Sequence, residues 1–269
     1  MGVMAEGEGK AWAKGRTAAN DSRIARNAIS RRGPRGPYRT GGLRRTFHRP
    51  RPLCWTPDLA YAVGLVATDG CLSSGRHIYF DSNDEQLVQT FLNCIGRPAR
   101  YTTRATRIGG TAYRASFSDV ELYRWLESIG LTPAKSLTLG AIDVPEQFLM
   151  PLVRGLLDGD GSVLNYVHAP TKRAYPNYTY ERLVVHFSTA SQTHADWLRA
   201  KLQPIIGNGN LACRPPRPPR HAFYTLRYGK AASVKLLGLL YADAAAPRLI
   251  RKWRTWDDYR RRLGADGGT

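Results

Sequence analysis

The sequence carries the stretch Leu59-Ala-Tyr-Ala-Val-Gly-Leu-Val-Ala-Thr-Asp-Gly70 and repeats its pattern at Met150-Pro-Leu-Val-Arg-Gly-Leu-Leu-Asp-Gly-Asp-Gly161. Both stretches are apolar runs that end in Asp-Gly. A single gapless alignment places Asp69 on Asp160. Because internal repeats of this kind mark a duplicated architecture, we interpret the chain as a pseudo-dimer with one such segment in each half.

Both stretches are predicted to be helices that pack against each other. Starting from Tyr61 and from Leu152, small and apolar residues recur at positions i, i+3, i+4 and i+7, which is one stripe of a helix. Each stripe contains a glycine, Gly64 or Gly155. Glycine inside a helix costs roughly 0.5–1 kcal/mol relative to alanine, and close approach of two backbones would explain it. Gly64 and Gly155 are therefore the predicted helix interface.

The ends of these helices carry the chemistry. Thr56, followed by Pro57, is a typical N-cap of the first helix, and Gly70 and Gly161 are expected to end the two helices in the left-handed conformation. Asp69 and Asp160 would then lie side by side at two negative helix ends. This arrangement favours a hard divalent cation, Mg²⁺ or another such as Mn²⁺, bound together with a substrate phosphate.

The composition indicates a polyanionic partner. Lysine and arginine number 40 against 21 acidic residues, so the formal net charge is +19. Nucleic acid is favoured over a membrane, because no apolar run approaches the ~20 residues of a membrane span and no signal-peptide pattern opens the chain. The four cysteines form no Cys-x-x-Cys pair, which disfavours zinc. We expect a cytoplasmic protein, or one that is organellar or phage-encoded.

Residues 1–52 differ from the rest of the chain. They are rich in Arg, Gly, Pro and Ala and lack a periodic apolar pattern, so we expect a disordered basic arm that supplies non-specific attraction to phosphates. Residues 53–143 and 144–263 form the two expected halves, and residues 264–269 form a tail.

The two motifs resemble those of the LAGLIDADG homing endonucleases of the monomeric, two-motif type, over roughly residues 54 to 260. Each half of that family has, after the motif helix, two strands, a helix, paired strands and a helix. The resemblance implies an α+β fold of two pseudo-symmetric αββαββα halves, with a saddle-shaped antiparallel DNA-binding surface and the motif helices at the centre. The segments that match this order are Arg76–Asp81, Asp84–Gly96, Ala99–Asp119, Val120–Gly130, Leu183–Ser188, Thr193–Gly207, Ala212–Tyr228, Ala231–Ala242 and Leu249–Trp253.

The resemblance also implies a site-specific DNA endonuclease, encoded free-standing or within an intron. Such an enzyme makes a metal-dependent double-strand break at a long asymmetric site of double-stranded DNA, and the protein is expected to be a monomer. The last acid of each motif is the metal ligand in the family. This role falls on Asp69 and Asp160, with the backbone carbonyls of the preceding residues as further ligands and one lysine near each scissile phosphate. These additional candidates are Thr68, Gly159, Lys135 and Lys252.

One departure from the family is visible, because Ala67 stands where a second acid is frequent, whereas the second motif has Asp158 there. Two other functions stay open. One is a non-cleaving DNA- or RNA-binding regulator or maturase derived from the same family. The other is a basic RNA-associated structural protein. Retention of both Asp69 and Asp160 favours the enzyme, since a binding protein has no need for two acids that repel each other.

The strands are predicted to lie in the major groove, whose base edges are distinguishable. Because side chains alternate along a strand, Ile78 and Phe80 should face the helices and their neighbours the DNA. The insertion Tyr166–Glu181 is expected to extend the contacts at one end of the site. The predicted DNA-facing residues are His77, Tyr79, Arg104, Arg107, Arg114, Ser116, Lys172, Arg173, Arg182, His186, Thr225 and Arg227.

Overall fold

The computed structural model describes residues 53–98, 100–106, 109–168 and 180–266, and for residue 168 and residues 264–266 the backbone alone. The chain divides into two units, Met1–His48 and Arg49–Thr269, and all described residues belong to the second. The basic arm expected at residues 1–52 and the predicted DNA-facing residues Arg107, Lys172 and Arg173 lie outside the described residues.

Two sets of elements follow each other in the same order. The first set ends in two short 3-10 turns, η2 (Lys135–Leu137) and η3 (Glu146–Phe148), and the second ends in an additional long helix. The first set comprises α2 (Pro57–Asp69), β1 (Gly70–Ser73), β2 (His77–Ser82), α3 (Glu85–Cys94), β3 (Thr102–Ala105), β4 (Thr111–Ser118) and α4 (Val120–Ser128). The second comprises α5 (Leu149–Asp158), β5 (Ser162–His168), β6 (Tyr180–Thr189), α6 (Gln192–Ile206), β7 (Asn210–Arg214), β8 (Phe223–Tyr228), α7 (Lys230–Leu240) and α8 (Ile250–Asp266).

Each set forms its own antiparallel sheet of four strands, with the orders β1-β2-β4-β3 and β5-β6-β8-β7. The two orders correspond strand for strand. This confirms the predicted α+β class with two αββαββα halves.

Local sequence signals start several helices. The Thr56 side chain accepts a hydrogen bond from the Leu59 N–H at 3.1 Å, and Pro57 occupies the first turn of α2. In the same way the Asp119 carboxylate accepts from the Leu122 N–H at 2.9 Å and caps α4. These caps satisfy N–H groups that have no partner within their own helix.

The alternation of the strands separates a buried face from an open one. Ile78 and Phe80 in β2 are fully buried, as are Ala115 in β4 and Leu183 and Val185 in β6. These side chains pack against helices that cover one face of each sheet, while the residues between them lie on the other face.

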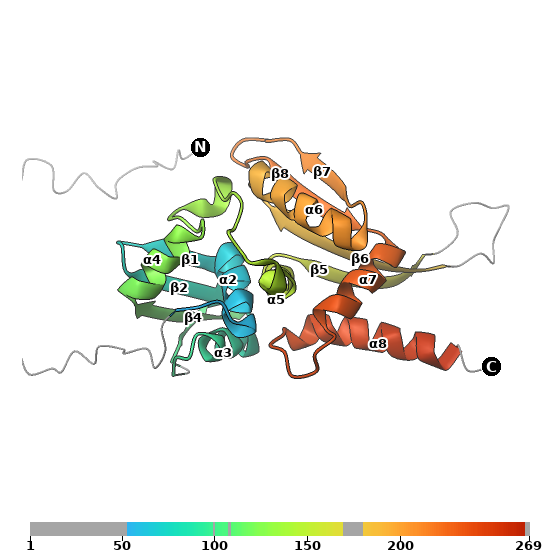
Figure 1. Ribbon diagram of the computed structural model, residues 1–269, viewed down its shortest axis with the longest axis horizontal. Coiled ribbons are helices and arrows are strands. Elements are labelled where there is room, and N and C mark those ends of the chain that lie inside the picture. The colour runs from blue at the N-terminus through green and yellow to red at the C-terminus, as the bar shows by residue number, and fades with distance from the viewer. Residues whose placement is uncertain (1–52, 99, 107–108, 169–179, 267–269) are drawn as a thin grey trace, which may run out of the picture. The chain divides into compact units, whose positions relative to one another are not determined.

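The motif helices α2 and α5 lie side by side, with one sheet on either side of the pair (Figure 1). Their backbones touch. A Cβ atom on Gly64 would lie 2.3 Å from the Leu152 carbonyl oxygen, and one on Gly155 would lie 2.2 Å from the Tyr61 carbonyl oxygen. No side chain larger than hydrogen fits at either position, which explains why glycine stands inside both helices.

The expectation that Gly70 and Gly161 end the helices in the left-handed conformation was wrong. Gly70 has φ −87° and ψ 158° and begins β1, and Gly161 is not among the described glycines of positive φ. These glycines are required for space instead. A Cβ atom on Gly70 would lie 2.6 Å from the Cα of Val66, and one on Gly161 would lie 2.7 Å from the Leu157 carbonyl oxygen.

Two segments are more regular than the sequence indicated. Both ends of the insertion Tyr166–Glu181 are strand, since Tyr166 pairs with Arg182 and His168 with Tyr180. The closing segment that begins at Leu249 continues as the long helix α8, which packs against β5. Among the described residues, no helix combines the length and the apolar composition needed to cross a membrane.

Candidate functional site

The two motif acids stand at adjacent helix ends. Asp69 is the last residue of α2, and Asp160 follows the end of α5 by two residues. Both side chains reach solvent, and neither carboxylate makes a hydrogen bond or an ion pair within the described part of the chain. Partial burial raises the pKa of Asp69 to about 6, and the negative charge of Asp160 is the second cause of this shift. Burial likewise raises the pKa of Asp160.

The raised pKa of Asp69 predicts that Asp69→Asn stabilises the metal-free protein at neutral pH. Because the pKa of Asp69 in the folded chain lies above its ordinary value of 3.8, ionising this carboxyl disfavours the folded state. The penalty is absent below about pH 3.8, grows as the pH rises and is complete above about pH 6. Urea unfolding of both proteins in EDTA should show Asp69→Asn as the more stable at neutral pH and equal stability at the acid limit. A gain that does not depend on pH would contradict the prediction.

Two buried lysines donate hydrogen bonds to backbone carbonyl oxygens at the same helix ends. Lys135 donates to the carbonyl oxygen of Gly70, the residue after α2. Lys252 donates to four carbonyl oxygens around the end of α5, at 2.7 Å to Leu157, 2.8 Å to Asp158, 3.1 Å to Gly159 and 2.7 Å to Gly161. Burial lowers the pKa of Lys252 to about 8. The ammonium of Lys252 therefore completes the last turn of α5, where the helix dipole favours a cation.

The unequal bonding predicts unequal effects of removing the two lysines. Lys252→Met is expected to lower the free energy of unfolding by about 2–3 kcal/mol, because several charge-assisted hydrogen bonds are lost and buried carbonyls stay unpaired. Lys135→Met should cost less, since one carbonyl loses its donor. Denaturant unfolding measures both. If the lysines also serve the scissile phosphates, each variant slows cleavage more on one DNA strand than on the other. Equal stability losses would contradict the capping role of Lys252.

A buried carboxylate, Asp158, connects three parts of the chain. It is 1% exposed and accepts hydrogen bonds from the Tyr61 hydroxyl at 2.8 Å, the Leu249 N–H at 2.7 Å and the Tyr241 hydroxyl at 3.3 Å. Burial raises its pKa to about 6. These bonds tie the start of α8 to the end of α5 and so fix the position of Lys252. Sequence reasoning noted this acid without a role, because all three of its partners lie more than 80 residues away.

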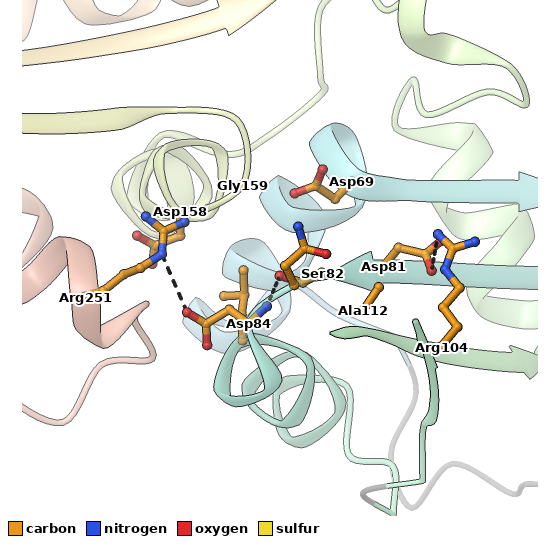
Figure 2. A pocket seen from close by; sticks show the side chains of 11 residues that line it. Asp69, Asp81, Ser82, Asp84, Arg104, Ala112, Asp158, Gly159 and Arg251 are labelled. Carbon is orange, nitrogen blue, oxygen red and sulfur yellow. Dashed lines mark hydrogen bonds and ion pairs between the residues drawn. The ribbon is translucent and has the colours of Figure 1, made fainter. Parts of the chain in front are cut away.

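Asp69 and Asp160 line two different pockets. Asp69 lines a pocket of about 570 Å³ together with Gly159, and Asp160 lines a narrow pocket of about 30 Å³ together with Thr68. Figure 2 shows the larger pocket, with Asp69 at the end of its helix beside Gly159. Each pocket thus combines the acid of one motif with the residue that precedes the acid in the other motif.

The donor set of these pockets fits a hard divalent cation. Carboxylate and carbonyl oxygens are the ligands that Mg²⁺ prefers, and Mg²⁺ completes its shell with water and substrate phosphate. Among the described residues no group of three or more His, Cys, Asp or Glu side chains could hold a metal ion. The two unpartnered carboxylates are available as ligands.

The strand register gathers the predicted DNA-facing residues on the open faces of the sheets. Tyr79 lies opposite Ser116 and Asp81 opposite Arg114 in the first sheet, and the second sheet repeats the pattern. Arg114 is held by Asp81 through two hydrogen bonds of 2.7 and 2.8 Å. Sequence reasoning missed Thr102, Ser118, Asn210 and Arg214, which the register places on the same faces. The predicted residues on these faces are His77, Tyr79, Arg104, Arg114 and Ser116 in the first sheet, and Arg182, His186, Thr225 and Arg227 in the second.

No protein-family model matches the sequence, and no curated protein matches it. Solved structures do. The meganuclease I-SmaMI bound to uncleaveable DNA is 11% identical over 78% of this chain and 89% of its own, with a TM-score of 0.50. A point mutant of I-SmaMI, in which alanine replaces a lysine, is 9% identical over 80% and 93%, with a TM-score of 0.53. The chain has the LAGLIDADG homing endonuclease fold.

In this LAGLIDADG fold, α2 and α5 are the central pair of helices, and Asp69 and Asp160 stand at their ends. The sequence motifs and the fold therefore lead to the same family of structures. A further match is the I-LtrWI LAGLIDADG homing endonuclease bound to target DNA, 10% identical over 76% of this chain and 88% of its own, with a TM-score of 0.47.

Proposed function

We propose that this chain is a site-specific DNA endonuclease that makes a divalent-metal-dependent double-strand break. One observation carries the proposal. Two carboxylates that have no partner among the described residues, Asp69 and Asp160, lie at adjacent helix ends, where burial and then the charge of Asp160 raise the pKa of Asp69. A binding protein gains nothing from this costly pair, whereas a nuclease uses such acids to hold cations at a phosphate.

The rest of the molecule supports DNA as the partner. The net charge of +19 favours a polyanion, and the open sheet faces carry arginine, histidine and hydroxyl side chains suited to base edges and phosphates. The similar fold of I-SmaMI has been crystallised with DNA. Because one chain contains both motif helices, we infer that a monomer binds one asymmetric site.

The chain supplies the framework of the hydrolysis. When bound, a divalent cation would neutralise the phosphate and lower the pKa of an attacking water. Asp69 with the Gly159 carbonyl, and Asp160 with the Thr68 carbonyl, offer the oxygen ligands at two positions. Lys252 and Asp158 keep the Gly159 segment in place. A water molecule gives up a proton to solvent as its oxygen bonds to phosphorus, and the bond to the 3′ oxygen breaks, with that oxygen taking a proton from solvent to leave as a hydroxyl. This happens once on each strand, and we expect it to leave a short 3′ overhang.

Cleavage of a selected duplex tests the proposal. The full chain would be used to select bound duplexes from a randomised library, and a selected duplex, labelled on each strand in turn, would be incubated with Mg²⁺, with Mn²⁺ or with EDTA. We expect cuts on both strands with either cation and none in EDTA. Tight sequence-specific binding without cleavage under any of these conditions would overturn the proposal in favour of a non-cleaving regulator or maturase.

The N-terminal segment gives a separate prediction. We propose that residues 1–52 attract phosphates without reading sequence, so their deletion should make the logarithm of the binding constant fall less steeply with the logarithm of salt concentration. The preference among selected sites should be unchanged. Binding measured over a salt series with cognate and scrambled duplexes decides the matter, and loss of sequence preference in the truncated chain would assign a reading role to this segment.

A further inference from the structure

The Asp69 pocket contains a cation that comes from the other half of the molecule. Arg251 belongs to the first turn of α8, yet it lines the pocket that contains Asp69 (Figure 2). Arg104 of β3 lines the same pocket. Two guanidinium groups thus line the same pocket as the acid that we propose to work on one scissile phosphate, and each is paired with another carboxylate, Arg251 with Asp84 and Arg104 with Asp81.

The backbone of Arg251 is held in place, whereas its guanidinium group is only weakly held. Its guanidinium is held by Asp84 at 3.6 Å, and its side chain is 66% exposed. An exposed pair of this kind contributes little to stability, so a phosphate could replace Asp84 at little cost. The next residue, Lys252, is buried and bonded to the end of α5, which holds the backbone of Arg251 beside the pocket.

The Asp160 pocket has no counterpart of this arginine. Within the described residues, its lining includes neither lysine nor arginine. Aligning Lys135 with Lys252 places Ala134 where the second half has Arg251. His194 lies in the Asp160 pocket, but it is buried against the Gly140 carbonyl at 2.9 Å, and burial lowers its pKa. The neutral histidine does not replace the missing guanidinium.

We propose that Arg251 is a catalytic residue of the Asp69 site, which leaves Asp84 when DNA enters and binds the non-bridging oxygens of the scissile phosphate. The planar guanidinium matches these oxygens in geometry and charge. This inference rests on the proposed nuclease function and adds that the two sites are unequal. One strand is cut with the help of an arginine and the other without it.

Strand-resolved cleavage tests the inference. Arg251→Gln should slow cutting of one strand about 10–100-fold, the usual range for a lost charge-assisted hydrogen bond, while the other strand is cut at the normal rate and nicked DNA accumulates. The matched control is Arg254→Gln, an exposed arginine one turn further along α8, which should leave the ratio of the two rates unchanged. Asp84→Asn should release Arg251 and raise affinity for the duplex, because the carboxylate that pairs with the guanidinium is removed. The Asp84 side chain makes no cap hydrogen bond, and asparagine suits the N-cap position, so the start of α3 should be unchanged.

A neutral phosphate supplies a readout that does not depend on activity. Binding in EDTA would be measured with duplexes in which one scissile phosphate is a methylphosphonate, on each strand in turn. On one strand, the substitution should weaken wild-type binding and leave Arg251→Gln binding unchanged. Equal weakening of both proteins on both strands, or equal cutting of both strands by Arg251→Gln, would overturn the inference while the nuclease function stands. A wild-type protein that binds but never cuts would instead overturn the nuclease function.

Discussion

Asp69→Asn and Asp160→Asn should each reduce cleavage by about 10²–10³-fold or more while sequence-specific binding survives. Each variant removes a proposed negative metal ligand from the pair of helix ends and should thereby weaken the charge stabilisation that the transition state needs. The sheet faces that we propose to bind DNA are untouched. Binding should even strengthen in the absence of metal, since one negative charge near the phosphates is gone.

The measurement is cleavage of strand-labelled duplex with Mg²⁺, paired with binding in EDTA. Asp258→Asn is the matched control, because this acid is exposed on α8 and belongs to neither pocket. It should cut like the wild type. Double-strand cleavage at the wild-type rate by either motif variant would contradict the proposed chemistry. A parallel loss of binding would show that the acids are needed for the folded structure instead.

The second large effect concerns the contact of the two central helices. Gly155→Val is expected to lower the free energy of unfolding by at least about 3 kcal/mol, at the upper end of overpacking costs, because its Cβ atom would lie 2.2 Å from the Tyr61 carbonyl oxygen and 3.0 Å from the Cα of Gly64. These are backbone atoms of a buried helix and cannot turn aside. Any folded fraction should also cleave poorly, since the helices carry Asp69 and Asp160 on their ends.

The control for this variant is Gly238→Ala in α7. Nothing lies within 4 Å of a Cβ atom at this helical position, so alanine should stabilise the chain by up to about 1 kcal/mol through helix propensity. Chemical denaturation of the two variants beside the wild type measures both effects. A Gly155→Val protein of normal stability would show that α2 and α5 do not meet backbone to backbone.

The elements and their order were predictable from the sequence because their signals are local. The cap at Thr56, the glycine stripe of Gly64 and the alternation around Ile78 act over a few residues along the chain. The repeat of the motif predicted that the two halves pair through their motif helices. The local signals failed at Gly70 and Gly161, where the glycine is required by contacts within the preceding turn and not by a left-handed backbone.

The composition of each pocket could not be derived from the sequence. The shared pocket of Asp69 and Gly159, the bonds of Asp158 to Tyr241 and Leu249, and the presence of Arg251 in the Asp69 pocket join residues far apart in the chain. No periodicity or spacing encodes such contacts, because they arise only when distant segments pack together, across the two halves for Asp69 and within the second half for Asp158. The sequence by itself determined which residue types stand at the helix ends. The tertiary structure decided their partners, since the crossing of α2 and α5 at two glycines brings each helix end next to the other half.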